Sequence, residues 1–223
     1  MRIVLLTQNF APDVGGIEVL MTGLAGALAG RGHSVLVLAD APRPGAPPEA
    51  GPPPPYAIRR FGGLRPWRRR RKAGHAARLL REKTVDAVIA DSWKSLELLP
   101  PPAGMPVLCL AHGMEFPLRP GPGKRRRIIR SLRGVQVIAN SRYTAERAAP
   151  FLDSTGDVTV IPPGIDAPPS PEPAERERAR QVLAGQAPRL ISVARLEPHK
   201  GIDRVLECLP SLLEDFPRLV YVI

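Results

Sequence analysis

Short apolar runs alternate with segments of helical periodicity along almost the whole chain, and this alternation constrains the fold more than any other feature. Strands that are apolar throughout and separated by helices are typical of a parallel sheet covered on both faces. The predicted strands are residues 2–6, 34–39, 57–61, 87–90, 107–110, 135–139 and 158–161. The helices predicted between them are residues 17–30, 73–83, 93–99, 124–133 and 141–149. The sequence therefore predicts an α/β fold with a Rossmann-like parallel sheet.

A proline-rich break after residue 161 divides the chain. Residues 1–166 are expected to form the first Rossmann-like domain, and residues 167–187 a linker with a charged helix. Residues 188–223 have the pattern of one further strand–helix–strand unit. That unit is shorter than the ~40 residues at which domains normally fold without disulfides, metals or partners. We therefore expect an incomplete second domain, either because the chain is a fragment or because the short unit packs on something else.

Composition excludes several classes of protein. Two cysteines, Cys109 and Cys208, cannot build a disulfide framework, which favours a reducing compartment. The longest apolar stretch, residues 16–30, contains Glu18 and is shorter than the ~20 residues of a spanning helix. The apolar run at the N-terminus is followed by polar residues before it reaches the length of the apolar region of an export signal. These features predict a cytoplasmic protein.

The formal net charge of +11 is confined to residues 1–166, because residues 167–223 carry eight basic and eight acidic side chains. Residues 59–83 carry eleven basic side chains against the single Glu82, and residues 119–133 carry seven against none. Such clusters occur on solvated helices, on surfaces that bind anionic membranes, and on nucleic-acid-binding proteins. Nucleic acid is the least favoured partner because aromatic residues and recognition motifs are lacking. The membrane alternative predicts peripheral binding to the inner face of the plasma membrane.

Several candidate site residues follow predicted strands, where ligands bind to open parallel sheets. Gly15 and Gly16 precede the first helix, where backbone can approach a phosphate or a sugar hydroxyl closely. A tight turn without a ligand is the alternative at this position. His112 follows the strand at 107–110 and can act as a hydrogen-bonding or acid–base group. The remaining candidates for the acceptor side or the cleft are Glu18, Glu115, Asn140, Ser141, Gly164 and Asp166. Ser141 is better explained as a helix N-cap, and Gly164 and Asp166 as parts of a turn.

Two cations lie at the start of the long helix in the second unit. Arg195 and Lys200 are five positions apart and are suited to neutralising a diphosphate. Surface charge is the alternative, but cations are disfavoured at a helix N-terminus unless an anion is present.

Six motifs in this order resemble the family 4 retaining glycosyltransferases. The motifs are Pro12-Asp13-Val14-Gly15-Gly16-Ile17-Glu18, Gly32-His33, His112-Gly113-Met114-Glu115, Ala139-Asn140-Ser141, Val160-Ile161-Pro162-Pro163-Gly164-Ile165-Asp166, and Ser192-Val193-Ala194-Arg195-Leu196 followed by Lys200-Gly201. The resemblance extends over essentially the whole chain. One departure is Pro163, where many members of the family have asparagine.

The resemblance implies a GT-B fold, with two Rossmann-like domains facing a cleft, and transfer of a hexose-type sugar from a nucleotide-diphosphate donor with retention of configuration. It assigns the acceptor, lipid-linked or a glycan, mainly to the first domain and the nucleotide sugar to the second. It further implies that Gly16 approaches the donor, that His112 contacts the transferred sugar, and that Arg195 and Lys200 hold the leaving diphosphate in place of a metal. No metal or other cofactor is therefore expected. The alternatives are a non-catalytic remnant or binding module, and a sugar-nucleotide epimerase of the same fold.

Overall fold

The structure is a computed structural model, and it describes residues 1–48, 52–101, 104–152, 158–164, 170–194 and 196–223. The chain divides into two compact units, Met1–Ile165 and Asp166–Ile223.

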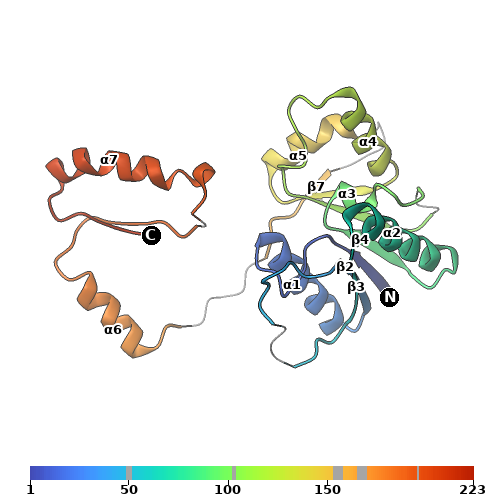
Figure 1. Ribbon diagram of the computed structural model, residues 1–223, viewed down its shortest axis with the longest axis horizontal. Coiled ribbons are helices and arrows are strands. Elements are labelled where there is room, and N and C mark those ends of the chain that lie inside the picture. The colour runs from blue at the N-terminus through green and yellow to red at the C-terminus, as the bar shows by residue number, and fades with distance from the viewer. Residues whose placement is uncertain (49–51, 102–103, 153–157, 165–169, 195) are drawn as a thin grey trace. The chain divides into compact units, whose positions relative to one another are not determined.

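The first unit is built on a seven-stranded sheet with the order β3-β2-β1-β4-β5-β6-β7, in which every neighbouring pair is parallel (Figure 1). Chain order reverses between β1 and β4, so the carboxyl ends of these two strands form the switch point at which open α/β sheets bind ligands. The strands are β1 (Arg2–Leu6), β2 (Ser34–Asp40), β3 (Ala57–Phe61), β4 (Ala87–Ala90), β5 (Val107–Ala111), β6 (Gln136–Ala139) and β7 (Val158–Val160).

The two faces of this sheet are covered unequally. The helices are α1 (Gly16–Gly30), α2 (Arg65–Arg81), α3 (Trp93–Leu96), α4 (Pro122–Leu132) and α5 (Arg142–Ala148), followed by the short helix η1 (Ala149–Phe151). Residues from α2, α3, α4 and α5 belong to one apolar cluster, which contains Trp93 and Ile128. A second cluster lies on the other face, and α1 contributes Met21 and Ala25 to it. Among the described helices of this unit, α1 is the only one in that second cluster.

The expected α/β class and parallel sheet are confirmed, and all nine predicted strands are present with shifts of one or two residues at some ends. Two expectations were wrong in detail. Helix α2 begins at Arg65, eight residues before the predicted start. Strand β3 is not apolar throughout, since it contains Arg59 and Arg60; it is an edge strand, where a polar side chain can reach water.

The second unit contains a parallel pair of strands, β8 (Arg189–Ile191) and β9 (Val220–Val222), joined through helix α7 (Ile202–Asp215). Helix α6 (Pro173–Val182) precedes this unit of strand, helix and strand, and the short helix η2 (Pro198–Lys200) lies just before α7. The predicted strand–helix–strand order is confirmed. Pro210 lies within α7, and the helix continues on both sides of it.

None of the helices in the described part of the chain combines the length and the apolar character needed to cross a lipid bilayer.

Candidate functional site

Four neighbouring strands of the sheet are each followed by a polar residue at the carboxyl edge. Thr7 follows β1, Asp91 follows β4, His112 follows β5 and Asn140 follows β6. Backbone hydrogen bonds join these ends, because Asp91 N donates to Leu6 O and Asn140 N donates to Ala111 O at 2.9 and 3.1 Å. The carboxyl edge therefore brings His112 and Asn140 of the predicted site together with two residues that were not predicted.

His112 is held in one orientation. Its ring Nε2 lies 3.0 Å from the carbonyl oxygen of Asp91. Because a carbonyl can only accept, Nε2 carries the hydrogen, and in the neutral ring Nδ1 is the acceptor. The backbone N–H of His112 donates to Glu115 Oε1 at 2.7 Å, so Glu115 fixes the loop that carries the imidazole. His112 thus presents a hydrogen-bond acceptor at Nδ1.

Asp91 connects the strand ends around His112, and sequence reasoning missed it. Its Oδ2 accepts from Thr7 Oγ1 and from the backbone N–H of Gln8, both at 2.8 Å. Its Oδ1 accepts from Ser95 Oγ at 2.6 Å. This buried carboxylate therefore joins the loop after β1 to α3. The backbone carbonyl of the same residue holds the ring of His112. Its position directly after a predicted apolar strand was the signal that could have identified it.

The predicted glycine turn lies at the start of α1 and is faced by an acidic side chain. A Cβ placed on Gly15 would lie 2.3 Å from Glu18 Oε2, so a larger residue at this position would force the carboxylate to move. Glu18 is 6% exposed and pairs with Arg43, whose Nη2 lies 3.0 Å from Glu18 Oε1. A Cβ placed on Gly16 would meet nothing within 4 Å. The open approach is therefore at Gly16, whereas the space beside Gly15 already holds a carboxylate.

Asn140 and Gly164 line one groove with His112, and Ser141 has a structural role. The groove has a volume of about 340 Å³ and is otherwise lined mainly by apolar side chains of α1, β5 and β6. Asn140 Oδ1 is buried and has no hydrogen-bond partner among the described residues. Ser141 Oγ accepts from Thr144 N at 3.2 Å, so the predicted N-cap is confirmed.

Two predicted site residues, Asp166 and Arg195, lie outside the described residues. Lys200 is exposed and ends η2, and Gly201 follows with a φ of 68°, a left-handed conformation that suits glycine. Lys200 therefore lies in η2, two residues before the start of α7, rather than in the long helix itself. Across the described ranges, no group of three or more His, Cys, Asp or Glu side chains is arranged to hold a metal ion.

The first basic cluster is not entirely a surface feature. Lys72 is 4% exposed, and its Nζ lies 2.7 Å from Asp40 Oδ1; Arg68 Nε lies 2.9 Å from Asp40 Oδ2. Burial lowers the pKa of Lys72, and the nearby carboxylate of Asp40 opposes that shift. Lys72 is therefore the one basic residue of the 59–83 cluster that the structure shows as buried. The side chains of Arg70 and Arg71 are exposed.

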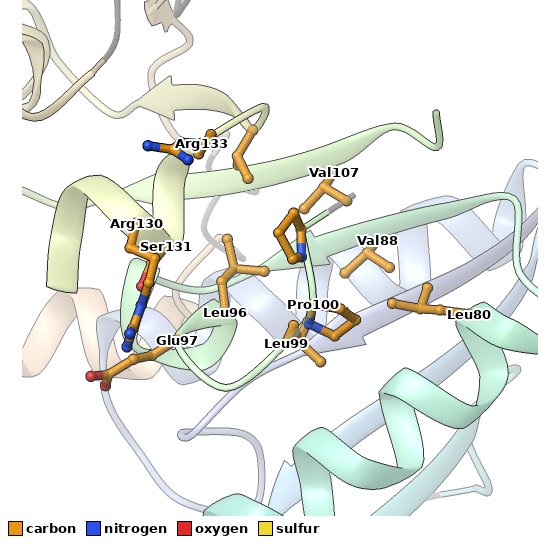
Figure 2. A pocket seen from close by; sticks show the side chains of 12 residues that line it. Leu80, Val88, Leu96, Glu97, Leu99, Pro100, Val107, Arg130, Ser131 and Arg133 are labelled. Atoms are coloured by element: carbon orange, nitrogen blue, oxygen red, sulfur yellow. The ribbon is translucent and has the colours of Figure 1, made fainter. Parts of the chain in front are cut away.

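A smaller cavity lies at the opposite, amino-terminal edge of the sheet (Figure 2). It has a volume of about 110 Å³, and its walls include Leu80, Val88 and Val107. In Figure 2 the carboxylate of Glu97 and the side chain of Arg130 lie at one end of this apolar lining. The cavity contains none of the residues predicted for the site.

Comparison with known proteins agrees with this fold. The family model described as Glycosyltransferase Family 4 matches residues 14–167. A GDP-mannose-dependent alpha-(1-6)-phosphatidylinositol monomannoside mannosyltransferase of Mycobacterium tuberculosis is 29% identical over 227 residues, covering 95% of this chain and 57% of the relative. A D-inositol 3-phosphate glycosyltransferase of Geodermatophilus obscurus is 28% identical over 245 residues, covering 96% of this chain and 54% of the relative. The chain thus spans little more than half the length of the curated relatives that it matches.

Solved structures show the same architecture. The crystal structure of Anabaena Alr3699/HepE in complex with UDP superposes with a TM-score of 0.67 at 16% identity, covering 99% of this chain and 68% of that one. This similarity supports the GT-B type of fold. Because the family model spans most of the chain, including the glycine turn and the edge that carries His112 and Asn140, the chain belongs to glycosyltransferase family 4.

Proposed function

We propose that the chain forms part of a glycosyltransferase that moves a hexose from a nucleoside diphosphate sugar to a hydroxyl group of a lipid-linked or glycan acceptor. The observation that carries the proposal is the shared carboxyl edge, where His112 and Asn140 follow adjacent strands next to the loop that leads to Gly16. Family membership supports the reaction class. The mycobacterial relative, which is named for its use of GDP-mannose, supports a nucleotide sugar as donor.

The proposed transfer retains the configuration of the sugar. The acceptor oxygen bonds to the anomeric carbon on the face from which the diphosphate leaves, and the bond between that carbon and the phosphate oxygen breaks. The proton of the acceptor hydroxyl passes to the departing phosphate. In this step His112 accepts a hydrogen bond at Nδ1 from a hydroxyl of the transferred sugar, because its Nε2 hydrogen is engaged by Asp91.

At the glycine turn, we propose that Gly16 contacts the sugar rather than a phosphate. The carboxylate of Glu18 faces Gly15; it can accept hydrogen bonds from sugar hydroxyls but has no donor to offer to the oxygens of a phosphate. Asn140, with Ser141 beside it, is proposed to face the acceptor, and Gly164 borders the groove. Arg195 and Lys200 neutralise the leaving diphosphate, so the proposed reaction needs no metal.

We further propose that the acceptor is reached at an anionic membrane surface, through the clusters at 59–83 and 119–133. Most of the basic side chains in these clusters are exposed, and so are the apolar side chains of Leu64, Trp67 and Leu118 at 76%, 64% and 80%. Amphipathic arginines beside exposed apolar residues suit the interface of an anionic bilayer. The protein would then be cytoplasmic and peripheral to the inner face of the plasma membrane, with nucleic acid an unsupported partner.

Titration calorimetry of the full chain with GDP-mannose and UDP-glucose tests the proposal, followed by transfer of labelled hexose to phosphatidylinositol in vesicles. Saturable heat with one donor and labelled lipid are the expected results. Flat traces with both donors would instead favour a non-catalytic binding module. Binding without transfer, together with isomerisation of the sugar, would favour the epimerase.

A further inference from the structure

Arg43 joins the loop after β2 to the glycine turn that precedes α1. Its backbone N–H donates to Asp13 Oδ1 at 3.0 Å, and its side-chain Nε lies 3.6 Å from Asp13 Oδ2. Its Nη2 donates to Glu18 Oε1 and to Asn9 Oδ1, both at 3.0 Å. A single guanidinium is therefore held at this turn by two carboxylates and one side-chain amide.

The two carboxylates are buried, whereas the guanidinium that pairs with them is open to solvent. The exposed fraction of the side chain is 8% for Asp13 and 7% for Glu18, but 62% for Arg43. Gly16 is also exposed, and a Cβ placed on it would meet nothing within 4 Å. A ligand can therefore approach the turn while the three charged groups stay paired.

One polar atom on each side of the Arg43–Glu18 pair is unused. Within the described ranges, no group accepts a hydrogen bond from Arg43 Nη1, and none donates to Glu18 Oε2, the atom that faces Gly15. Nη1 carries two N–H groups, and a carboxylate oxygen can only accept. Since Glu18 is 6% exposed, leaving this oxygen without a donor is costly, which favours a ligand that supplies one.

We propose that Arg43 and Glu18 together bind two neighbouring hydroxyl groups of a hexose, which makes Arg43 a specificity-determining residue of the glycine turn. A hydroxyl both donates and accepts, so one can donate to Glu18 Oε2 while its neighbour accepts from Arg43 Nη1. An ionised phosphate could use only the arginine, because it has no hydrogen for Glu18. The inference rests on the proposed function only in naming this hexose as the sugar that is transferred.

The test measures binding of methyl α-mannoside and methyl α-glucoside to the full chain by ligand-observed nuclear magnetic resonance. Arg43→Ala should weaken binding of the preferred sugar about tenfold or more, because a hydrogen bond from a charged donor is lost. Arg31→Ala removes an exposed arginine at the other end of α1 and, as the matched control, should leave the affinity unchanged. If the parent binds neither sugar, or if the two variants bind equally well, the proposal is overturned.

Arg43→Lys separates contact with the sugar from support of the turn, and it serves as the test if Arg43→Ala does not fold. Lysine keeps the positive charge beside the carboxylates, but Asp13, Glu18 and Asn9 would occupy its three N–H donors. Thermal melting should therefore place Arg43→Lys close to the parent protein, while its affinity for the sugar remains about tenfold weaker. An Arg43→Lys variant that binds the sugar like the parent would overturn the proposed contact.

Monodeoxy analogues of the preferred methyl glycoside identify the hydroxyl that Arg43 contacts. The analogue without that hydroxyl should bind the parent about tenfold more weakly than the complete sugar does. Arg43→Ala should bind this analogue and the complete sugar equally well, because the interaction between the two groups is already lost. If Arg43→Ala weakens binding of every analogue by the same factor, its effect is general and the proposal is overturned.

Nucleotide sugars distinguish this inference from the proposed function. If the methyl glycoside binds in an Arg43-dependent way but neither GDP-mannose nor UDP-glucose binds, the hexose contact stands and the transferase proposal fails. If a nucleotide sugar binds the parent and Arg43→Ala equally well, the transferase proposal stands and the contact at Arg43 is overturned.

Discussion

Lys72 and Asp40 form an ion pair inside the first unit, with 2.7 Å between Nζ and Oδ1. Both side chains are less than a tenth exposed, and Lys72 also donates to the carbonyl oxygen of Thr7. Helix α2 is thereby joined to the carboxyl ends of β2 and β1. These are the strand ends that border the proposed site.

Asp40→Asn should destabilise the protein strongly, because it leaves the buried ammonium of Lys72 without its carboxylate. Removing one partner of a buried pair typically costs about 3 kcal/mol in free energy of unfolding or more. Urea denaturation monitored by circular dichroism measures the change. Glu82→Gln is the matched control, since it removes the carboxylate of an exposed pair with Arg78 and should cost about 1 kcal/mol or less. Similar losses for both variants would contradict the structural role of the buried pair.

Glu97 connects α2 to α4 and should make stability depend on pH. Its Oε2 lies 2.6 Å from Arg69 Nη2, and its Oε1 pairs with Arg127. The hydrogen bond from Arg127, assisted by Arg69, holds the pKa of Glu97 below its usual range. A carboxylate with a lowered folded pKa stabilises the protein above its unfolded pKa, and that stabilisation is lost as pH falls through the folded value.

Glu97→Gln should therefore lower the melting temperature at pH 7, by the equivalent of about 2 kcal/mol. The difference between variant and parent should shrink as the pH falls below about 4.3, where the unfolded carboxyl is half protonated. Thermal melting between pH 7 and pH 2.5 measures this. A difference that stays constant over the whole range would show that the ion pairs do not account for the effect.

The strands could be predicted from sequence because buried parallel strands appear as continuous apolar runs. The first half of α2 could not, because Trp67 is exposed and the side chains that anchor this half are Arg68, Arg69 and Lys72. Their partners, Asp40 and Glu97, lie far away in the chain. Periodicity of apolar residues therefore gave no signal where charged contacts hold the helix.

The sequence likewise identified only some residues of the candidate site. His112 and Asn140 were identified because both follow apolar strands. Asp91 has the same position after β4, but its role depends on hydrogen bonds to Thr7 and Gln8, which the register of β1 and β4 creates. The carboxylate of Glu18 beside Gly15 also depends on side-chain conformation, which a sequence pattern does not specify.

His112→Ala should weaken binding of the sugar part of the donor more than binding of the nucleotide. Loss of one hydrogen bond at Nδ1 corresponds to roughly tenfold weaker binding of GDP-mannose, while the affinity for GDP should change little. Titration calorimetry with the two ligands measures both values. Glu115→Gln is a milder comparison, because it changes the acceptor of the His112 backbone N–H and leaves the ring in place. An equal loss for GDP and GDP-mannose would contradict a contact between His112 and the sugar.

Replacing Arg70 and Arg71 by alanine should weaken binding to anionic vesicles. Both side chains are exposed on α2, and a basic residue near an anionic bilayer contributes about 1 kcal/mol, so the double variant should bind roughly thirtyfold more weakly. Arg176→Ala with Arg178→Ala is the matched control, because it removes two exposed arginines from α6, in the part of the chain with balanced charge. Co-sedimentation with phosphatidylserine-containing and neutral vesicles, at two salt concentrations, measures the effect. Since the attraction is screened by salt, equal binding of the parent to both kinds of vesicle would count against an anionic membrane as the partner of these clusters.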